Sequence, residues 1–195
     1  MTASMDPYVY PGTNVLRNLR EIQDDVEFSF FEATETTARI LGLRLSPISG
    51  RYDVAHLKAI HKAIFQDVFI WAGQFRTVNI SKGDSMFASA PFIEPALTKL
   101  FQRLDREDGL RGLDVETFSK RAGFYLSEIN AAHPFREGNG RTQREFLREL
   151  GLTAANVSID WRRITRPQMA AASRDSFKTG NSDGMAALIR TCIDG

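Results

Sequence analysis

Apolar residues recur at steps of three and four in several separate stretches of this 195-residue chain. Such spacing places them on one face of an α-helix, which a globular protein buries against its core. The clearest stripe comprises Leu57, Ile60, Ile64 and Val68. Strand-like alternation is confined to one short stretch, residues 77–88. The sequence therefore predicts an all-α fold with one short β-hairpin.

The first predicted helix runs from Asp25, as N-cap, to about Leu41, where Gly42 and Pro47 follow,. Its apolar face is expected to comprise Val26, Phe30, Ala33, Thr37 and Ile40. Asp53 is expected to cap the second helix, and later helices to begin near Pro91, Asp114, Asn139, Thr165, and Asn181 or Ser182,.

The chain length predicts a single domain over residues 1–195, with residues 1–13 as an irregular arm lying on it,. Lys and Arg number 25 against 24 Asp and Glu, so no global field would attract nucleic acid or a membrane surface,. The single cysteine cannot form an internal disulfide, and no leader or long apolar run opens the chain,. A bacterial cytoplasmic location is expected, with export by a specialised secretion system left open.

The stretch that carries chemistry is His133–Arg144, with the sequence HPFREGNGRTQR. Pro134 disfavours helical geometry at His133, and the glycines at 138 and 140 allow a tight turn before the next helix. The unpaired N–H groups at the start of that helix, together with its dipole, form an anion site.

Charged residues around this turn indicate a metal-bound polyphosphate. Arg141 and Arg144 lie on one face of the predicted helix and can each hold phosphate oxygens, whereas Phe146 and Leu147 face the core. Glu137 would repel phosphate alone, but one carboxylate together with substrate phosphates is a common arrangement for Mg²⁺. His133 can take a proton near neutral pH, as an attacking hydroxyl requires.

This stretch resembles the signature of the Fic family, His-Pro-Phe-x-Asp/Glu-Gly-Asn-Gly/Lys-Arg-x-x-Arg, at all nine defined positions. Residues 77–88 resemble the family's hairpin, called the flap, and the Tyr-Pro-Gly opening resembles that of short bacterial Fic toxins. A Fic-type helical domain is therefore expected, with residues 133–144 as its motif.

The resemblance implies a role for each motif residue. His133 is the general base, Phe135 anchors the loop, and Glu137 holds Mg²⁺. Phosphates of ATP are bound by Gly138, Asn139, Gly140, Arg141 and Arg144. The flap residues Val78, Asn79, Ile80, Ser81, Lys82 and Gly83 dock an extended target segment.

The implied activity is protein adenylylation, in which AMP from ATP is moved onto a Tyr, Ser or Thr hydroxyl of another protein. Gly140 favours this reaction over the phosphotransfer of the branch with Lys there. Similar short toxins modify gyrase and topoisomerase IV, which makes these enzymes candidate targets. No glutamate in a Ser/Thr-x-x-x-Glu-Gly/Asn pattern exists in this chain. A separate small helical antitoxin is therefore expected to supply an inhibitory glutamate to Arg144.

Other interpretations stay open at this point. The chain could be a secreted effector with a host target, or a pseudoenzyme that holds nucleotide without transferring it. A nucleic-acid binder using Arg141, Arg144 and Arg148 is disfavoured by the near-neutral charge,. Arg148 is expected on a solvated face, beside a neighbouring acid. His56 and His61 are expected to be structural or solvated, and Met86 and Phe87 to pack or to touch adenine.

Overall fold

The computed structural model describes residues 6–82 and 85–193. Along these residues lie seven α-helices: α1 (Asp25–Leu45), α2 (Val54–Phe65), α3 (Ile93–Arg106), α4 (Val115–Ala132), α5 (Asn139–Ala154), α6 (Arg166–Thr179) and α7 (Asp183–Cys192). Short 3-10 turns occupy Ala90–Phe92, Asp108–Leu110 and Trp161–Arg163. The strands β1 (Ser81–Lys82) and β2 (Ser85–Met86) pair antiparallel, with Ser81 opposite Met86. The predicted all-α fold with one hairpin is confirmed.

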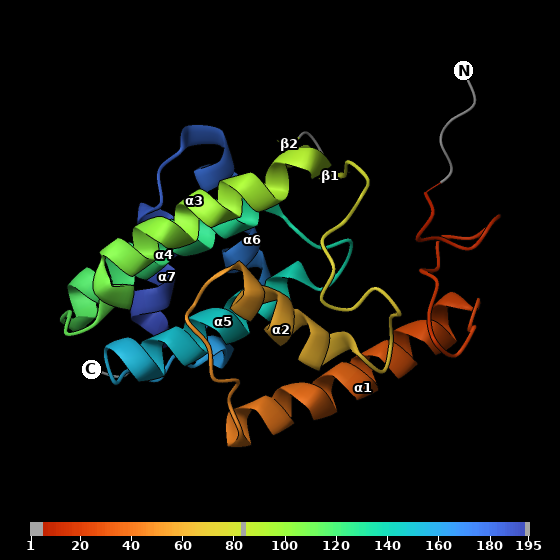
Figure 1. Ribbon diagram of the computed structural model, residues 1–195, viewed down its shortest axis with the longest axis horizontal. Coiled ribbons are helices and arrows are strands. Elements are labelled where there is room, and N and C mark those ends of the chain that lie inside the picture. Colours follow the sequence, from red (N-terminus) through yellow and green to blue (C-terminus); the bar gives the residue numbers. More distant parts are fainter. Residues whose placement is uncertain (1–5, 83–84, 194–195) are drawn as a thin grey trace.

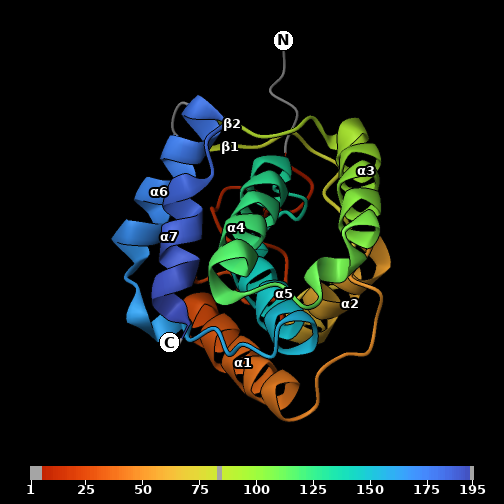
Figure 2. The same cartoon turned by 90° about the vertical axis from the view of Figure 1, so that its left-hand side faces the viewer.

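Helices α4 and α5 form the centre of the molecule (Figure 2). In that view α6 and α7 cover one side, α2 and α3 the other, and α1 crosses below. The side chains of Phe118 and Tyr125 on α4 and of Phe146 and Leu147 on α5 are 0% exposed. Within the described residues, no helix is long and apolar enough to cross a membrane. The motif connects α4 to α5, the two helices at the centre of the domain (Figure 1).

Most helix signals in the sequence are confirmed. Asp53 accepts the N–H of His56 at the start of α2, and Asp114 accepts that of Thr117 at the start of α4. Thr165 and Gln168 form a reciprocal capping box on α6,. Leu57, Ile60 and Ile64 of the predicted stripe lie in α2 and are completely buried, whereas Val68 is equally buried but follows the end of the helix at Phe65.

The prediction for the first helix is partly wrong. Asp24, not Asp25, caps α1, and the helix continues through Gly42 to Leu45. Val26 and Phe30, expected in the core, are 78% and 76% exposed. Helix α1 buries Phe28, Thr36 and Leu43 instead, because it lies across the edge of the domain and offers only a narrow face to α2.

Phe146 and Leu147 of the motif helix face the core as predicted, but the expectation that Arg148 lies on a solvated face is wrong. Helix α5 is buried on nearly all sides, as its central position requires. Arg148 is 8% exposed and is paired with Glu145, its Nη2 lying 2.6 Å from Oε1. A buried guanidinium is tolerated there because a carboxylate compensates its charge.

The described part of the N-terminal arm lies on the domain as expected. Asp6 forms an ion pair with Arg136 of the motif, with Nη2 and Oδ2 2.8 Å apart. The hydroxyl of Tyr8 accepts the N–H of Thr77 at 3.1 Å. The arm therefore contacts both the motif and the residue that begins the flap.

Candidate active site

His133 is the residue that caps the C-terminus of α4. Its backbone is left-handed, with φ 43° and ψ 62°, a conformation that non-glycine residues rarely adopt,. Nδ1 lies 3.3 Å from the carbonyl oxygen of Asn130, which can only accept, so Nδ1 carries the proton of the neutral ring,. The ring stacks on Phe87 with centroids 3.9 Å apart. Nε2 is therefore the basic nitrogen, held in a fixed ring orientation.

The segment from His133 to Gly140, here called the motif loop, ends in a bare helix N-terminus. Gly138 caps α5 at φ 81° without any side-chain hydrogen bond to the helix. The structure shows no acceptor among residues 6–82 and 85–193 for the N–H groups of Asn139, Gly140 and Arg141. Amides without an acceptor at the positive end of a helix dipole are a feature that anions bind, so the geometry is compatible with the predicted anion site.

Asn139 secures the turn of the motif loop. Its Oδ1 accepts the N–H of Phe135 at 2.9 Å, and its Nδ2 donates to the carbonyl of Phe135 at 2.7 Å. The residue is 4% exposed. Because both polar atoms of the side chain are used inside the loop, its backbone N–H is the group left for the predicted phosphate contact.

His61 has the structural role that was one of its two expected roles, but its hydrogen bond to the motif loop was not predicted from the sequence. Its Nδ1 accepts the N–H of Gly73 at 2.8 Å, so Nε2 carries the proton and donates to the carbonyl of Glu137 at 3.1 Å. Burial lowers the pKa of His61 to about 3, which keeps the ring neutral near pH 7,. Its position near a helix stripe gave no indication that a hydrogen bond would reach residue 137.

Phe135 is the buried anchor of the loop, at 1% exposed. Its ring stacks on His61 with centroids 3.8 Å apart. We expect Phe135→Ala to lower the free energy of unfolding by about 3–5 kcal/mol, because it leaves a cavity beneath the loop. Urea unfolding would measure the loss, with the 68% exposed Phe92 replaced by alanine as the control. A loss below about 1 kcal/mol would contradict the anchoring role.

Glu137 provides the one carboxylate of the motif. It is 47% exposed at the side chain, and its Oε1 accepts the N–H of Gly138 at 2.8 Å. Arg141 Nη2 lies 3.5 Å from the same oxygen. The described residues gather no group of three or more His, Cys, Asp or Glu side chains that could hold a metal ion. An accessible single carboxylate beside an anion site fits Mg²⁺ held partly by substrate phosphates.

The two motif arginines have different surroundings. Arg141 forms an ion pair with Glu32 of α1 at 2.5 Å and donates to the hydroxyl of Thr36 at 3.1 Å. In the described part of the chain no carboxylate pairs with Arg144, whose pKa is lowered by burial and by the charges of Arg141 and Arg166. Arg144 therefore carries an uncompensated positive charge above the first turn of α5, where an anion would stabilise it.

The flap is shorter than predicted. Among the flap residues that the structure describes, only 81–82 and 85–86 form strands, and Gly83 lies outside the described residues. Asn79 precedes the hairpin, and its Oδ1 accepts the N–H of Ala90 at 2.9 Å. Val78 and Ile80 are half-buried, while Ser81 is exposed. Met86 is 72% exposed, whereas Phe87 is buried against His133.

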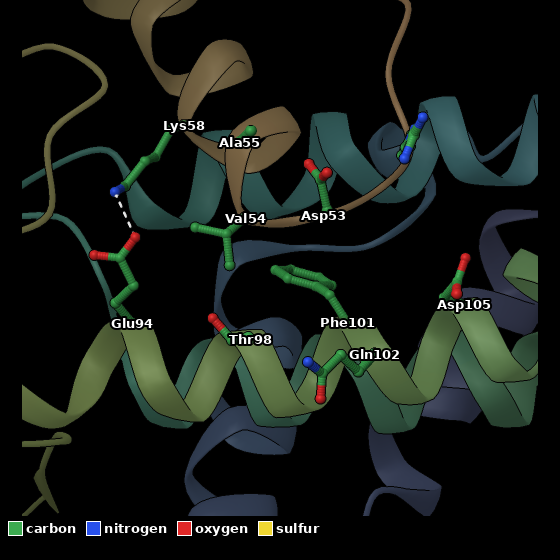
Figure 3. Close-up of a pocket in the computed structure, with 10 residues that line it drawn as sticks. Asp53, Val54, Ala55, Lys58, Glu94, Thr98, Phe101, Gln102 and Asp105 are labelled. Carbon is green, nitrogen blue, oxygen red and sulfur yellow. Dashed lines mark hydrogen bonds and ion pairs between the residues drawn. The ribbon is translucent and has the colours of Figure 1, made fainter.

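Two cavities flank different parts of the domain. The larger, about 500 Å³, lies between α2 and α3, is lined by Asp53, Lys58, Glu94 and Phe101, and includes no motif residue (Figure 3). The smaller, about 350 Å³, is lined by Asp6, Thr77, Val78 and Asn79. The second cavity adjoins the flap, and its residue Asp6 is the partner of Arg136.

Comparison with known proteins identifies the family to which this chain belongs. Residues 51–150 match the Fic/DOC family, and the chain belongs to this family. It is 48% identical over 187 residues to the protein adenylyltransferase VbhT of Bartonella schoenbuchensis, covering 96% of this chain but 39% of VbhT. It is 41% identical to the probable protein adenylyltransferase y4lH of Sinorhizobium fredii, covering 96% of each protein.

Solved structures share the fold. The BepC effector of Bartonella tribocorum, with bound AMPPNP, has a TM-score of 0.89 at 28% identity and covers 98% of this chain and 99% of its own. A Fic domain from Bartonella quintana with bound ADP has a TM-score of 0.88 at 32% identity, covering 96% of this chain and 94% of that one. Both of these neighbours bind adenine nucleotides.

Proposed function

We propose that this chain transfers AMP from ATP to a hydroxyl side chain of a target protein. The observation that carries the proposal is the juxtaposition within one loop of a basic imidazole nitrogen and a bare helix N-terminus. In the proposed complex His133 Nε2 acts as the base, since Nδ1 contacts the carbonyl of Asn130, and the amides of residues 139–141 bind the phosphates. Relatives of near-equal length bear the name probable protein adenylyltransferase, which agrees with this chemistry.

In the proposed reaction the target hydroxyl attacks the α-phosphorus in line with the leaving group. Its proton passes to Nε2 of His133, the new O–P bond forms, and the bond from the α-phosphorus to the bridging oxygen of pyrophosphate breaks. The amides at the start of α5 and the guanidinium of Arg144 offset charge on the phosphates. The two phosphates beyond the broken bond leave together as pyrophosphate.

The experiment that tests this assignment asks whether the α-phosphate or the γ-phosphate of ATP is transferred to protein. The purified chain is incubated with a bacterial lysate and ATP labelled at either the α- or the γ-phosphate. Label from the α-position alone should reach protein, and mass spectrometry should find a mass increase of one AMP on a Tyr, Ser or Thr. Label from the γ-position would indicate a kinase instead, and no label from either would favour the pseudoenzyme.

Mg²⁺ fits the site, where Glu137 would hold it and the ion would supply charge neutralisation on the phosphates. We expect Glu137→Ala to reduce AMP transfer by about 10²-fold or more, with partial recovery at excess Mg²⁺, because the phosphates retain their own share of the ligands. Initial rates across a Mg²⁺ series measure both effects. Glu27→Ala on α1, remote in sequence from the motif, is the control. Wild-type activity that survives thorough chelation would contradict the metal role.

We further propose that a separate helical antitoxin restrains this activity. Its glutamate would pair with Arg144, whose charge no described carboxylate compensates,. Val26 and Phe30, exposed on α1, offer apolar contact to such a helix. Co-expression of candidate antitoxins should remove the label from target protein, and Glu→Gln at the inhibitory position should restore it. Inhibition that survives this substitution would count against the pairing with Arg144.

The candidate targets are type II topoisomerases, with a tyrosine as acceptor. Purified gyrase and topoisomerase IV should then become labelled and lose supercoiling or decatenation activity. The alternative is a secreted effector with a host target, which is favoured by several solved neighbours that are VirB-translocated Bartonella effectors. Expression without any antitoxin separates the two, because a toxin should arrest bacterial growth and an effector should not.

A further inference from the structure

Arg76 immediately precedes the flap and is 2% exposed. Its guanidinium donates to four backbone carbonyls. Nε reaches the carbonyl of His133 at 2.9 Å, and Nη1 that of Val78 at 2.7 Å. Nη2 reaches the carbonyls of Ala88 at 2.5 Å and Ala132 at 3.2 Å. Only the planar fork of an arginine offers enough donors in fixed directions to join these groups.

The charge of Arg76 is compensated without a carboxylate. In residues 6–82 and 85–193 no acidic side chain pairs with it, and burial lowers its pKa. Two of its acceptors, Ala132 and His133, are carbonyls at the C-terminus of α4, where the helix dipole is negative,. A buried cation is costly unless fully hydrogen-bonded, so the carbonyl contacts account for its presence.

The four carbonyls belong to two functional segments. Val78 and Ala88 lie at the two ends of the flap, before β1 and after β2. His133 is the proposed base, and Ala132 precedes it. Main-chain bonds join the same segments, because Arg76 N–H donates to the Pro134 carbonyl at 2.9 Å and Ala88 N–H to the Ala131 carbonyl at 3.3 Å. Arg76 therefore connects the two ends of the flap to the end of α4 and the start of the motif loop.

This connection acts directly on the conformation of His133. The left-handed backbone of His133 has a free-energy cost that its surroundings must offset,. The bond from Arg76 Nε fixes its carbonyl, and Phe87, adjacent to Ala88, stacks on its ring. A shift of the flap would therefore change the position of the ring that accepts the proton.

We propose that Arg76 is a positioning residue for AMP transfer. It sets the register between the flap and His133, so that a hydroxyl on a segment docked along the flap is presented to Nε2. This inference rests on the proposed transfer reaction. The proposed role of Arg76 does not include nucleotide binding, because its guanidinium hydrogen-bonds to none of residues 137–141, the proposed anion site.

The test compares Arg76→Lys, which keeps the charge but not the fork, with Arg148→Lys as a matched control. Arg148 is also a buried arginine, but its partners are on α5 and α1. Three quantities are measured: AMPPNP affinity by calorimetry, transfer from α-labelled ATP to the main labelled protein of a bacterial lysate, and amide hydrogen exchange. Arg76→Gln, which removes the buried charge, replaces Arg76→Lys should the latter unfold.

For Arg76→Lys we expect AMPPNP affinity within about threefold of wild type and transfer reduced by roughly 10²-fold, as for a small displacement of reacting groups. Exchange of the Phe87 and Ala88 amides should rise. Arg148→Lys should lower the melting temperature without these changes. Wild-type transfer by Arg76→Lys, or equal losses in both variants, would overturn the inference. If the wild type itself transfers no AMP, the proposed function fails, whereas unchanged exchange at Phe87 and Ala88 refutes the Arg76 connection independently.

Discussion

Replacing His133 by alanine is expected to reduce AMP transfer by about 10²–10⁴-fold, the usual contribution of a positioned general base. The structure gives the reason, since the contact of Nδ1 with Asn130 leaves Nε2 as the basic nitrogen, and Phe87 fixes the plane of the ring. Nucleotide binding should persist, because the proposed phosphate site consists of the amides of residues 139–141 and does not include the imidazole. The loss should therefore appear in the rate of transfer.

Two measurements separate this role from a structural one. AMPPNP affinity of His133→Ala should stay near the wild-type value, and so should its melting temperature. His133→Asn is the second variant, because asparagine tolerates the left-handed backbone at this position but cannot accept the proton,. Near wild-type transfer by either variant would refute the assignment of His133 as the base.

Replacing Gly138 by alanine is expected to disable the anion site and to lower the free energy of unfolding by about 2–5 kcal/mol. Two causes combine. Gly138 has φ 81°, and an added Cβ would lie 2.2 Å from ring atoms of Phe65. Phe65 is 0% exposed and cannot withdraw, so the turn must move. The amides at the start of α5 would move with it, and AMPPNP affinity should fall.

Gly180 offers a matched control for this change. It has φ 72° at the end of α6, yet an added Cβ would meet nothing within 4 Å. Gly180→Ala should therefore show only the backbone cost, about 1–2 kcal/mol, with AMPPNP affinity unchanged. Urea unfolding and calorimetry on both variants separate the two causes. Equal effects in the two variants would show that contact with Phe65 has no influence on the anion site.

The sequence alone predicted the helical class and the motif loop for local reasons. The apolar stripe of α2, caps such as Asp53 and Thr165, and the turn around Gly138 depend on residues a few positions apart, and these predictions are confirmed. The motif residues also follow one another in the chain, so their proximity needs no knowledge of the fold. The local turn is only part of the reason for Gly138, because the ring of Phe65, far away in the sequence, also excludes a side chain there.

Tertiary structure decided which helix faces are buried and which residues distant in the sequence hydrogen-bond to the motif loop. Val26 and Phe30 follow a helical spacing, but no element within residues 6–82 and 85–193 covers them, whereas Arg148 is enclosed because α5 lies at the centre. His61 and Arg76 reach the loop from another part of the chain, and their sequence surroundings name no partner. Periodicity records which residues can share a face, but burial and long-range hydrogen bonds depend on where the other helices pack.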